Sequence, residues 1–342
     1  MTILAALTAF LATVWLTRRF CDPASRFHIL DHPTERSLHH QPVPRTGGVA
    51  VVSGVLAGWL VLTIAPLDGT HLHGIVLSAL PVALVSFLDD RHGVHPGVRF
   101  LVHLGVAGLL LGAGLLPATI GLPGLVWTPP PTLAAGLAIL FVVWMINLYN
   151  FMDGMDGFAG GMTVIGFATF AFCGLQAGHA PFASASLLVA AASAGFLVFN
   201  FPPARIFLGD CGSSTLGFLA AAFSLWGSLE HIFPWWTAVL IFSPFSVDAT
   251  VTLCRRLLRS EKIWLPHKTH YYQRLVQLGW GHRRTLLAEY RLMLACSLSA
   301  ILAGGWPPPL QIGLALLWLA AYILLMVGVE RLDRRHDRVT AP

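Results

Sequence analysis

Long apolar runs separated by short polar segments dominate this chain. If about 17 to 25 apolar residues make one membrane crossing, the pattern predicts about eleven helices. We place them near residues 2–17, 46–66, 72–88, 100–119, 132–149, 158–176, 182–200, 214–229, 233–253, 288–305 and 309–329. The runs follow one another without a linker, so we expect a single domain over residues 1–342. The predicted fold class is all-α, a polytopic helical bundle in a membrane.

The basic residues predict the orientation of this bundle. An odd number of crossings puts the two ends of the chain on opposite sides, and Lys and Arg concentrate in cytoplasmic segments. With a periplasmic N-terminus and a cytoplasmic C-terminus, the inner segments and Arg291 hold all 21 Lys and Arg residues. These segments are 18–45, 89–99, 150–157, 201–213, 254–287 and the tail from 330. The first run has no basic residue before it and Arg18 and Arg19 after it, which favours a retained helix over a signal peptide.

Composition agrees with a membrane location. Hydrophobic residues make up 56% of the chain and charged residues 11%, against about 25% charged in an average soluble domain. The net charge of +5 belongs to the inner face and suits anionic lipid headgroups and phosphorylated substrates. No nucleic-acid-binding module is evident. The five cysteines are scattered, so neither a disulfide framework nor a zinc site is indicated.

Two adjacent acids, Asp89 and Asp90, end the third predicted helix in SFLDDRHGV. They repel each other and face the negative end of the helix dipole, and a bound cation would relieve both costs. The alternative is a solvated pair of loop acids.

A second polar group follows the fifth predicted helix in NLYNFMDGMDGFAGG. Asn147, Asn150, Asp153 and Asp156 recur at intervals of three, which would place them along one drifting helix face. Amide and carboxylate oxygens are hard ligands of the kind that Mg²⁺ prefers. The alternative is a glycine-rich turn whose Asn and Asp cap the next helix.

The segment FLGDCGSS places Asp210 between Gly209 and Gly212, just before Ser213 begins the eighth predicted helix. Backbone amides in such a turn can bind phosphate, and an aspartate beside them can hold its metal ion. An ordinary capped helix start explains the same residues.

The first inner loop, RSLHHQPVPRTGGVA, offers Arg36, His39 and Arg45 as contacts for lipid or nucleotide phosphates. A loop that needs only bulk positive charge is the alternative. The long inner loop contains PHKTHYYQRL, in which His267, His270, Gln273 and Arg274 are candidate substrate contacts.

Zinc is a weaker interpretation of the two histidines, because no HExxH motif and no third soft ligand lie nearby. An amphipathic interfacial helix is the ordinary alternative. Asp248 lies about two turns before Arg255, and we expect the two to pair in a structural role.

All these motifs fall on the same predicted face of the membrane. In this order they resemble the polyprenyl-phosphate N-acetylhexosamine-1-phosphate transferases of the glycosyltransferase family 4 type. RSLHHQPVPRTGG is similar to that family's first cytoplasmic loop, LDDRHGV to its aspartate pair, NLYNFMDGMDG to its Asn/Asp block and LGDCGSS to its metal-binding turn. HKTHYYQRL is similar to its His-containing loop, in the form of the O-antigen initiating branch. The match covers nearly the whole chain.

The resemblance implies roles for individual residues. Asp210 and Asn150 would be metal ligands, Asp153 and Asp156 would support substrate or metal, and Asp89 and Asp90 would engage the lipid phosphate. The peptidoglycan branch carries an extra acid and a lysine around the aspartate pair and a later triple histidine, which this chain lacks. A muramyl-pentapeptide substrate is therefore disfavoured.

The implied reaction is transfer of N-acetylhexosamine 1-phosphate from a UDP-N-acetylhexosamine to undecaprenyl or another polyprenyl phosphate. It would release UMP, need Mg²⁺ or alternatively Mn²⁺, and initiate a surface polysaccharide at the cytoplasmic face of a bacterial inner membrane. A homodimer is compatible with this function. The sequence leaves open the sugar, the prenyl length and the choice between one-step and two-step transfer.

Three other functions fit less well. A secondary transporter would carry its acids near the membrane midplane rather than at helix ends. A CDP-alcohol phosphotransferase would show a longer signature than Asp153-Gly154-Met155-Asp156-Gly157. A non-catalytic membrane scaffold would not need so many polar motifs.

Overall fold

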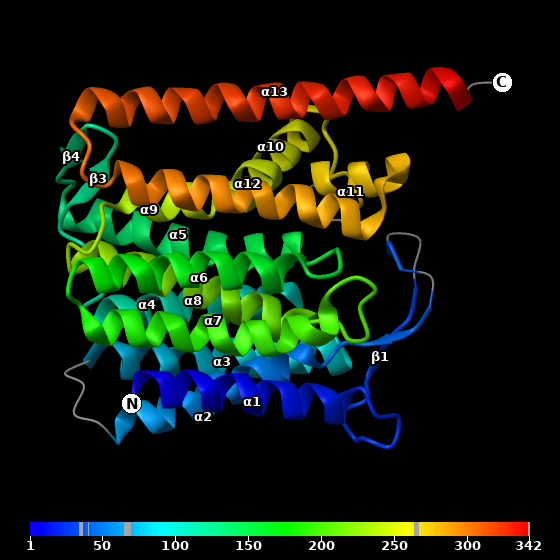
Figure 1. Cartoon of the computed structure of the whole chain (residues 1–342), viewed down its shortest axis with the longest axis horizontal. Coiled ribbons are helices and arrows are strands. Elements are labelled where there is room, and N and C mark those ends of the chain that lie inside the picture. The colour runs from blue at the N-terminus through cyan, green and yellow to red at the C-terminus, as the bar shows by residue number, and fades with distance from the viewer. Residues whose placement is uncertain (34–36, 40, 65–69, 263–266, 341–342) are drawn as a thin grey trace.

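The computed structural model describes residues 1–33, 37–39, 41–64, 70–262 and 267–340. Helices running roughly side by side make up nearly all of it (Figure 1). In chain order the helices are α1 Thr2–Phe20, α2 Gly47–Thr63, α3 Thr70–His92, α4 Pro96–Gly112, α5 Pro131–Met152, α6 Phe158–Gln176, α7 Ala180–Asn200, α8 Gly209–Leu229, α9 Trp235–Ile241, α10 Ser243–Leu258, α11 Tyr271–Leu275, η1 Val276–Trp280, α12 Gly281–Ala303 and α13 Pro308–Thr340. The all-α prediction is confirmed.

Among the described residues, seven helices are long and apolar enough to cross a membrane, or eight if the bent pair α9 and α10 forms one crossing. Each of the eleven predicted runs contains helix among its described residues, but α2 and α4 have only 17 residues each, and α8 does not pass the same test of length and hydropathy. The helix α8 begins with Gly209, Asp210 and Cys211, so part of its length is polar. The protein is therefore a multi-pass membrane protein, with fewer crossings by these criteria than the sequence pattern predicts.

The predicted run 233–253 is two helices rather than one. The helices α9 and α10 meet at an angle of 76° around Phe242. Pro244 fits at the start of α10 because the first residues of a helix need no internal N–H donor. The bend redirects α10 so that Asp248 reaches the segment beginning at His270.

Two short antiparallel strand pairs were not predicted. The strands β1 (Leu30–Asp31) and β2 (Val43–Pro44) pair within the first inner loop, and β3 (Ile120–Leu122) pairs with β4 (Leu125–Trp127) at the other end of the bundle. Strand pairs of two or three residues leave little alternation to read in a sequence. The first pair matters for the site, because it orients the chain just before Arg45.

The helices α2 and α8 approach each other backbone to backbone at Gly48 and Gly212. A Cβ atom added at Gly48 would lie 2.1 Å from the Gly212 nitrogen, so only glycine fits. Backbone hydrogen bonds from Gly47 to Phe207 and from Gly48 to Leu208 join the same segments. This contact places Arg45 beside the start of α8.

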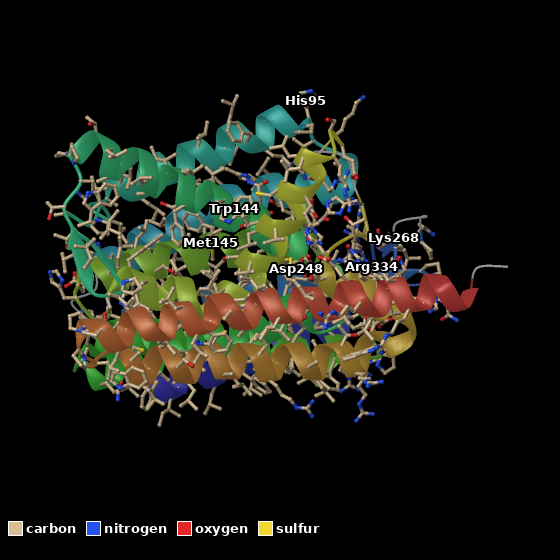
Figure 2. The ribbon with its side chains drawn as sticks, turned by 90° about the horizontal axis from the view of Figure 1, so that it is seen from above. His95, Trp144, Met145, Asp248, Lys268 and Arg334 are labelled. Atoms are coloured by element: carbon tan, nitrogen blue, oxygen red, sulfur yellow. The ribbon has the colours of Figure 1, made fainter. Side chains whose placement is uncertain are left out.

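The start of α1 and the end of α13 lie at opposite ends of the bundle (Figure 1). Lys268 and Arg334 share one end (Figure 2), and the β3–β4 pair lies at the other. Lys268 and Arg334, which come from two of the predicted inner segments, therefore lie at the same end of the bundle.

Candidate active site

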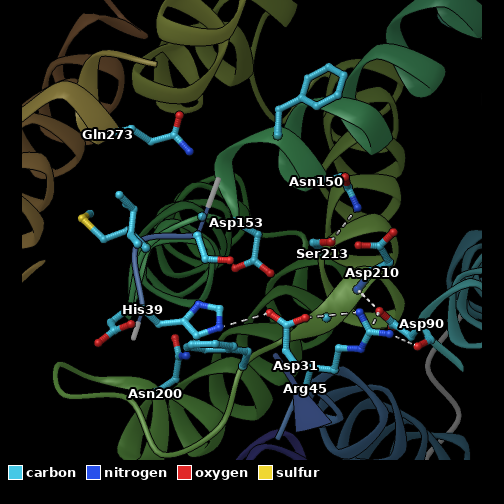
Figure 3. Close-up of a pocket in the computed structure, with 18 of the residues that line it drawn as sticks. Asp31, His39, Arg45, Asp90, Asn150, Asp153, Asn200, Asp210, Ser213 and Gln273 are labelled. Carbon is cyan, nitrogen blue, oxygen red and sulfur yellow. Dashed lines mark hydrogen bonds and ion pairs between the residues drawn. The ribbon is translucent and has the colours of Figure 1, made fainter. Parts of the chain in front are cut away.

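The end of the bundle that carries Lys268 and Arg334 contains a pocket of about 590 Å³. Segments far apart in the sequence line it, from the first inner loop to the start of α12. The predicted residues that line it are His39, Arg45, Asp89, Asp90, Asn150, Asp153, Asp156, Gly209, Asp210, Ser213, His267, His270 and Gln273. Ten of the lining residues, among them Asp90, Asp153 and Asp210, are labelled in Figure 3.

Arg36, a further predicted residue, lies outside the described residues. Two described residues of the prediction, Asn147 and Arg274, do not line the pocket. Asn147 turns back along its own helix and donates to the Val143 carbonyl oxygen (2.7 Å). Arg274 donates to Asp333 of α13 (2.6 Å from Nε) and packs over the Tyr271 ring, so it ties two helices together. In this arrangement Asn147 and Arg274 therefore do not face the pocket, and their substrate contacts stay predictions.

Asp90 is buried and connects α3 to the start of α8. Its carboxylate accepts hydrogen bonds from the backbone nitrogens of Asp210 (3.1 Å) and Cys211 (2.9 Å). These are amides that the sequence suggested for phosphate binding, and here a carboxylate of the protein takes them. Gly209 makes the turn possible with φ +72°, and a Cβ there would lie 2.3 Å from the Arg45 carbonyl oxygen.

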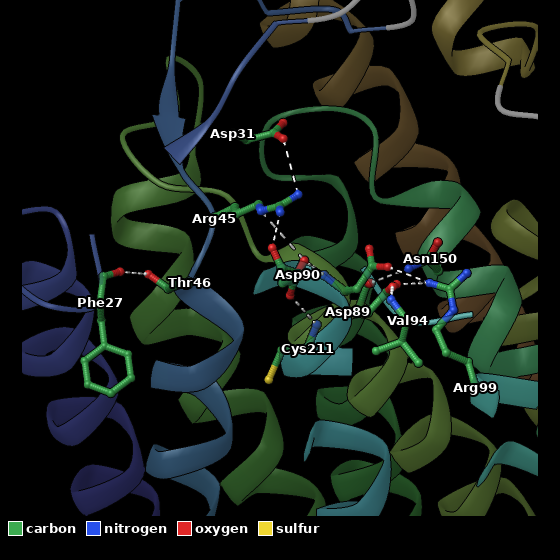
Figure 4. A network of polar contacts seen from close by, with 12 residues as sticks. Phe27, Asp31, Arg45, Thr46, Asp89, Asp90, Val94, Arg99, Asn150 and Cys211 are labelled. Atoms are coloured by element: carbon green, nitrogen blue, oxygen red, sulfur yellow. Dashed lines mark hydrogen bonds and ion pairs between the residues drawn. The ribbon is translucent and has the colours of Figure 1, made fainter. Parts of the chain in front are cut away.

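Asp89 points to the other side of the same turn (Figure 4). Its Oδ1 accepts from the Val94 nitrogen (2.6 Å), and its Oδ2 pairs with the Arg99 guanidinium. The same Arg99 nitrogen lies 3.0 Å from Asp210 Oδ2. The Asp210 side chain is also within hydrogen-bonding reach of Asn150 and Asp89. Arg99 therefore holds two acids from different helices.

Sequence reasoning treated Arg99 only as part of the positive inner segment. His95 and Pro96 begin α4, with the His95 ring accepting from the Gly97 nitrogen (3.1 Å). That helix start was the signal in the sequence that could have placed Arg99 in the first turn, beside the aspartate pair.

Arg45 lies on the wall formed by the first inner loop. Its guanidinium donates to the Asp90 carbonyl oxygen and lies 3.5 Å from Asp31 Oδ1, while His39 lies 3.6 Å from Asp31 Oδ2. Asp31 was missed, because a single acid in a basic loop carries no pattern. Its position in β1 is fixed by pairing with Val43.

Asp153 follows the last residue of α5 and is surrounded by protein although part of it remains exposed. Burial raises the pKa of this carboxyl well above its usual range, and the negative charges of Asp210 and Asp90 raise it further. Asp156, three residues on, accepts from the Ala204 nitrogen (3.0 Å) and lies 3.0 Å from His282 Nδ1. Asp156 thus joins three loops, and His282 is another pocket residue that the sequence reasoning missed.

Asn200 at the end of α7 is a further missed residue of the pocket wall. Its Oδ1 accepts from the Gly157 nitrogen and its Nδ2 donates to the Ile206 carbonyl oxygen, both at 2.8 Å. It holds the turn that carries Asp153 and Asp156 against the loop that leads to Asp210.

The donor set fits a divalent cation in its chemistry. Asp89, Asp90, Asp153 and Asp210 supply carboxylate oxygens and Asn150 an amide oxygen, the ligand types of Mg²⁺. Among the described residues, Arg45 and Arg99 form the ion pairs with these acids. Within the described part of the chain, however, no three His, Cys, Asp or Glu side chains already converge as ligands of one ion. Because Arg99 stands between Asp89 and Asp210, a cation binding there would require it to move.

The opposite wall carries the two histidines. Burial lowers the pKa of His267 to about 4, helped by the positive charges of His270 and Arg256. The sequence predicted that Asp248 pairs with Arg255, and this prediction is wrong. Arg255 pairs with Glu330, and Asp248 contacts His270 at 3.1 Å.

A second cavity, of about 640 Å³, is an open apolar groove between α2 and α3. Its lining residues are Phe27, Val49, Val52, Ser53, Leu77, Leu80, Pro81, Ala83, Leu84, Phe87 and Cys211. Cys211 is the residue whose amide binds Asp90, so the groove ends one residue away from the polar pocket.

Comparison with known proteins identifies the family. Residues 72–228, which include the aspartate pair, the Asn/Asp block and Asp210, match the family model of Glycosyl transferase family 4. The probable undecaprenyl-phosphate N-acetylglucosaminyl 1-phosphate transferase of Bacillus subtilis is 32% identical over 333 residues, which are 95% of this chain and 88% of that protein. The chain belongs to glycosyl transferase family 4.

Other members of this family are more distant. The decaprenyl-phosphate N-acetylglucosaminephosphotransferase of Mycolicibacterium smegmatis is 29% identical, over 84% of this chain and 77% of that protein. The phospho-N-acetylmuramoyl-pentapeptide-transferase of Geobacillus kaustophilus is 27% identical, over 89% and 98%. The family resemblance and the enzyme class inferred from the motifs, a glycosyl-1-phosphate transferase, are confirmed.

Proposed function

We propose that this protein transfers N-acetylhexosamine 1-phosphate from a UDP-N-acetylhexosamine to a polyprenyl phosphate, releases UMP and begins a lipid-linked surface polysaccharide such as an O-antigen. N-acetylglucosamine is the first sugar to test, because the relatives from Bacillus and Mycolicibacterium are named for it. The main observation in support is the pocket, beside an apolar groove, that gathers Asp89 of α3, Asn150 and Asp153 at the end of α5, and Asp210 of α8.

Two anions meet in this reaction, so repulsion between the lipid phosphate and the pyrophosphate must be reduced. Asp210 and Asn150, with Asp153 nearby, are our choice for holding Mg²⁺, which when bound would screen the pyrophosphate and stabilise UMP as the leaving group. Arg45 and Arg99 can each donate to phosphate oxygens once their present acid partners release them. Asp89 is our choice for keeping the lipid phosphate deprotonated.

The two cavities suggest how the substrates divide the site. The apolar groove between α2 and α3 suits the prenyl chain, and it ends at Cys211 on the Asp90 side of the pocket. The side lined by His267, His270 and Gln273 is then left for the UDP-sugar.

The membrane arrangement is part of the same proposal. We propose that α2, α4, α8 and the bent pair α9–α10 cross the membrane together with the seven long helices, which gives eleven crossings. The pocket then opens at the cytoplasmic face, where UDP-sugars are available.

Asp89→Asn tests the proposal. Purified protein with UDP-N-acetylglucosamine, undecaprenyl phosphate and Mg²⁺ should release UMP, and the variant should lose at least about 100-fold in turnover while remaining folded, since a general base contributes about 10²- to 10⁴-fold. Asp22→Asn is the matched control, because Asp22 is an exposed acid that pairs with Arg19 outside the pocket. Near-normal UMP release by Asp89→Asn would refute the role of Asp89, and no release by the native protein with any UDP-N-acetylhexosamine would refute the function.

A further inference from the structure

Asp248 lies buried in α10, beside the start of α11, and is outside the pocket itself. Its Oδ1 accepts from His270 Nδ1 (3.1 Å), the Tyr271 nitrogen (3.0 Å) and Thr252 Oγ1 (3.1 Å), and its Oδ2 accepts from the Tyr272 nitrogen (3.1 Å). The buried Asp248 carboxylate thus has four hydrogen-bond contacts within the protein, whereas an exposed carboxylate would be hydrated by water. The acid therefore fixes the segment His270–Tyr272 in place.

These contacts determine which nitrogen of His270 carries the proton. Backbone N–H groups and a hydroxyl all donate to the Asp248 oxygens, so these oxygens act as acceptors. A ring nitrogen at 3.1 Å from such an oxygen avoids repulsion when it carries the hydrogen, so we assign the proton to Nδ1, although the same side chain also forms a capping box with the Gln273 backbone at the start of α11. The other ring nitrogen, Nε2, is then the atom that is left for a substrate.

The ring of His270 has little freedom to turn. It stacks on the Tyr272 ring at 5.9 Å with an angle of 18°, and the His267 ring lies 4.8 Å away. The Tyr272 hydroxyl donates to the Phe151 carbonyl oxygen (3.3 Å), which fixes Tyr272 as well. His270 lines the pocket although it is almost fully buried, so a single edge of the ring is available to a ligand.

His267 presents the opposite arrangement. Its Nδ1 accepts from the Thr269 nitrogen (3.4 Å) and lies 2.9 Å from Thr269 Oγ1. The ring is uncharged near neutral pH, because its pKa is lowered to about 4, so its proton is on Nε2. The two neighbouring rings therefore offer one acceptor and one donor, a pair that matches an amide or hydroxyl group of a sugar nucleotide.

We propose that Asp248 is a positioning residue for the UDP-sugar: it orients His270 so that Nε2 accepts a hydrogen bond from an N–H or O–H group of that substrate. This inference rests on the proposed function. The sugar nucleotide is favoured over the lipid, because the apolar groove ends on the Asp90 side and Gln273 lies across the pocket from Asp90 (Figure 3).

The test is a double-mutant cycle on the full-length protein in detergent. Asp248→Asn, His270→Gln and the double variant are compared by UMP release, with KM measured separately for UDP-N-acetylglucosamine and for undecaprenyl phosphate. Loss of a residue that orients a ligand-binding histidine typically costs about 10- to 100-fold, so kcat/KM for the UDP-sugar should fall by that factor in Asp248→Asn while KM for the lipid stays unchanged. The double variant should be no worse than His270→Gln alone, because Asp248 acts through His270.

Thr252→Val is the matched control. It removes one donor from the same carboxylate without touching His270, and it should change kcat/KM by less than about threefold, within the range of a neutral hydrogen bond. Additive losses in the cycle, or a rise in KM for the lipid instead, would overturn the inference while leaving UMP release by the native protein, and hence the proposed function, intact.

If Asp248→Asn does not fold, nitrogen-15 spectra of histidine-labelled native protein decide the question. The His270 signals, assigned by their absence in His270→Gln, should show a protonated Nδ1. A His270 protonated only at Nε2 would overturn the inference.

Discussion

The balance of charge among individual residues shapes this site. The described lining of the pocket contains two arginines and six aspartates: Asp31, Asp89, Asp90, Asp153, Asp156 and Asp210. The Asp90 carboxylate accepts hydrogen bonds from two backbone amides of α8. Asp153 has no such hydrogen-bond donor among the described residues, and burial, with the negative charges of Asp210 and Asp90, raises its pKa. A bound cation would offset much of this repulsion, in agreement with the proposed role of these acids in holding Mg²⁺.

We therefore predict a pH dependence of stability that comes from Asp153. The pKa of Asp153 is raised in the folded state, so the folded protein binds more protons than the unfolded chain once the pH exceeds the ordinary Asp value of about 3.9. The contribution of Asp153 to the free energy of unfolding is therefore lost as the pH rises through the raised pKa. In EDTA, the melting temperature of the native protein should fall more between about pH 5 and about pH 8 than that of Asp153→Asn. Added Mg²⁺ should raise the melting temperature mainly at the higher pH.

The control for this measurement is Asp22→Asn, whose pH profile should match that of the native protein. Identical profiles for Asp153→Asn and the native protein would show that Asp153 is not the group responsible.

Which site residues could be predicted from the sequence depended on their grouping. The aspartate pair, the Asn/Asp block and Asp210 stand in recurring or glycine-flanked patterns, and all of these except Asn147 line the pocket. Arg99 and Asp31 are single residues whose role depends on what another segment places beside them. Asn147 lies one helical turn before Asn150, further from the end of α5 at Met152, and it donates to Val143 of its own helix instead of lining the pocket.

At the level of helices, the close contact between α2 and α8 holds the first inner loop, which carries Arg45, next to the turn that carries Asp210. Gly48 and Gly212 touch through their backbones, and the chain on either side carries Arg45 and Asp210. A backbone atom at this contact cannot move aside to accommodate an added methyl group, whereas the end of a long side chain could. The contact therefore sets the distance between the first inner loop and the aspartates.

Gly48→Ala tests this contact. The added methyl group would meet the Gly212 nitrogen at 2.1 Å and the Leu208 carbonyl oxygen at 2.7 Å, so α2 and α8 must separate. We expect a loss of about 1 to 3 kcal/mol in the free energy of unfolding, the usual range for overpacking, together with a large loss of UMP release. The melting temperature and the rate of UMP release are the measurements.

Gly105→Ala in α4 is the matched control, because a Cβ there meets nothing within 4 Å. Replacing this helical glycine should leave activity unchanged and stabilise the protein by up to about 1 kcal/mol. Equal behaviour of the two variants would show that the contact between α2 and α8 does not position the site.

The apolar runs predicted where helices lie along the chain, but they did not predict the direction of α10 and α11. The bend at Phe242 follows from packing around a proline-containing segment, and the long inner segment 254–287 contains α11, η1 and the start of α12, where the sequence suggested a loop. Hydropathy reports burial in a membrane and says little about a helix that lies across the bundle at its polar end. That polar end carries His267 and His270, the proposed substrate contacts.

Across the whole molecule, the pocket and the β3–β4 pair lie at opposite ends of the bundle, and this separation makes the orientation testable. Lys268 is exposed and adjoins His267 of the pocket, and Leu125 is exposed in β4 (59%). If Lys and Arg concentrate on the cytoplasmic side, Lys268 faces the cytoplasm and Leu125 the periplasm. Single cysteines at these positions report the two faces independently.

We predict that Leu125→Cys reacts with a membrane-impermeant maleimide in intact cells, whereas Lys268→Cys reacts only after the membrane is permeabilised. The background carries Cys21→Ser and Cys254→Ser, because the other three cysteines are buried. UMP release by each variant confirms that the site is intact. Labelling of Lys268→Cys from outside would place the pocket on the periplasmic face, where the proposed UDP-sugar is not supplied, and the reaction could not proceed as proposed. If Leu125→Cys is labelled from outside and Lys268→Cys only after permeabilisation, the Lys- and Arg-rich segments and the pocket share the cytoplasmic side. The proposed transfer of the sugar phosphate would then take place on that side.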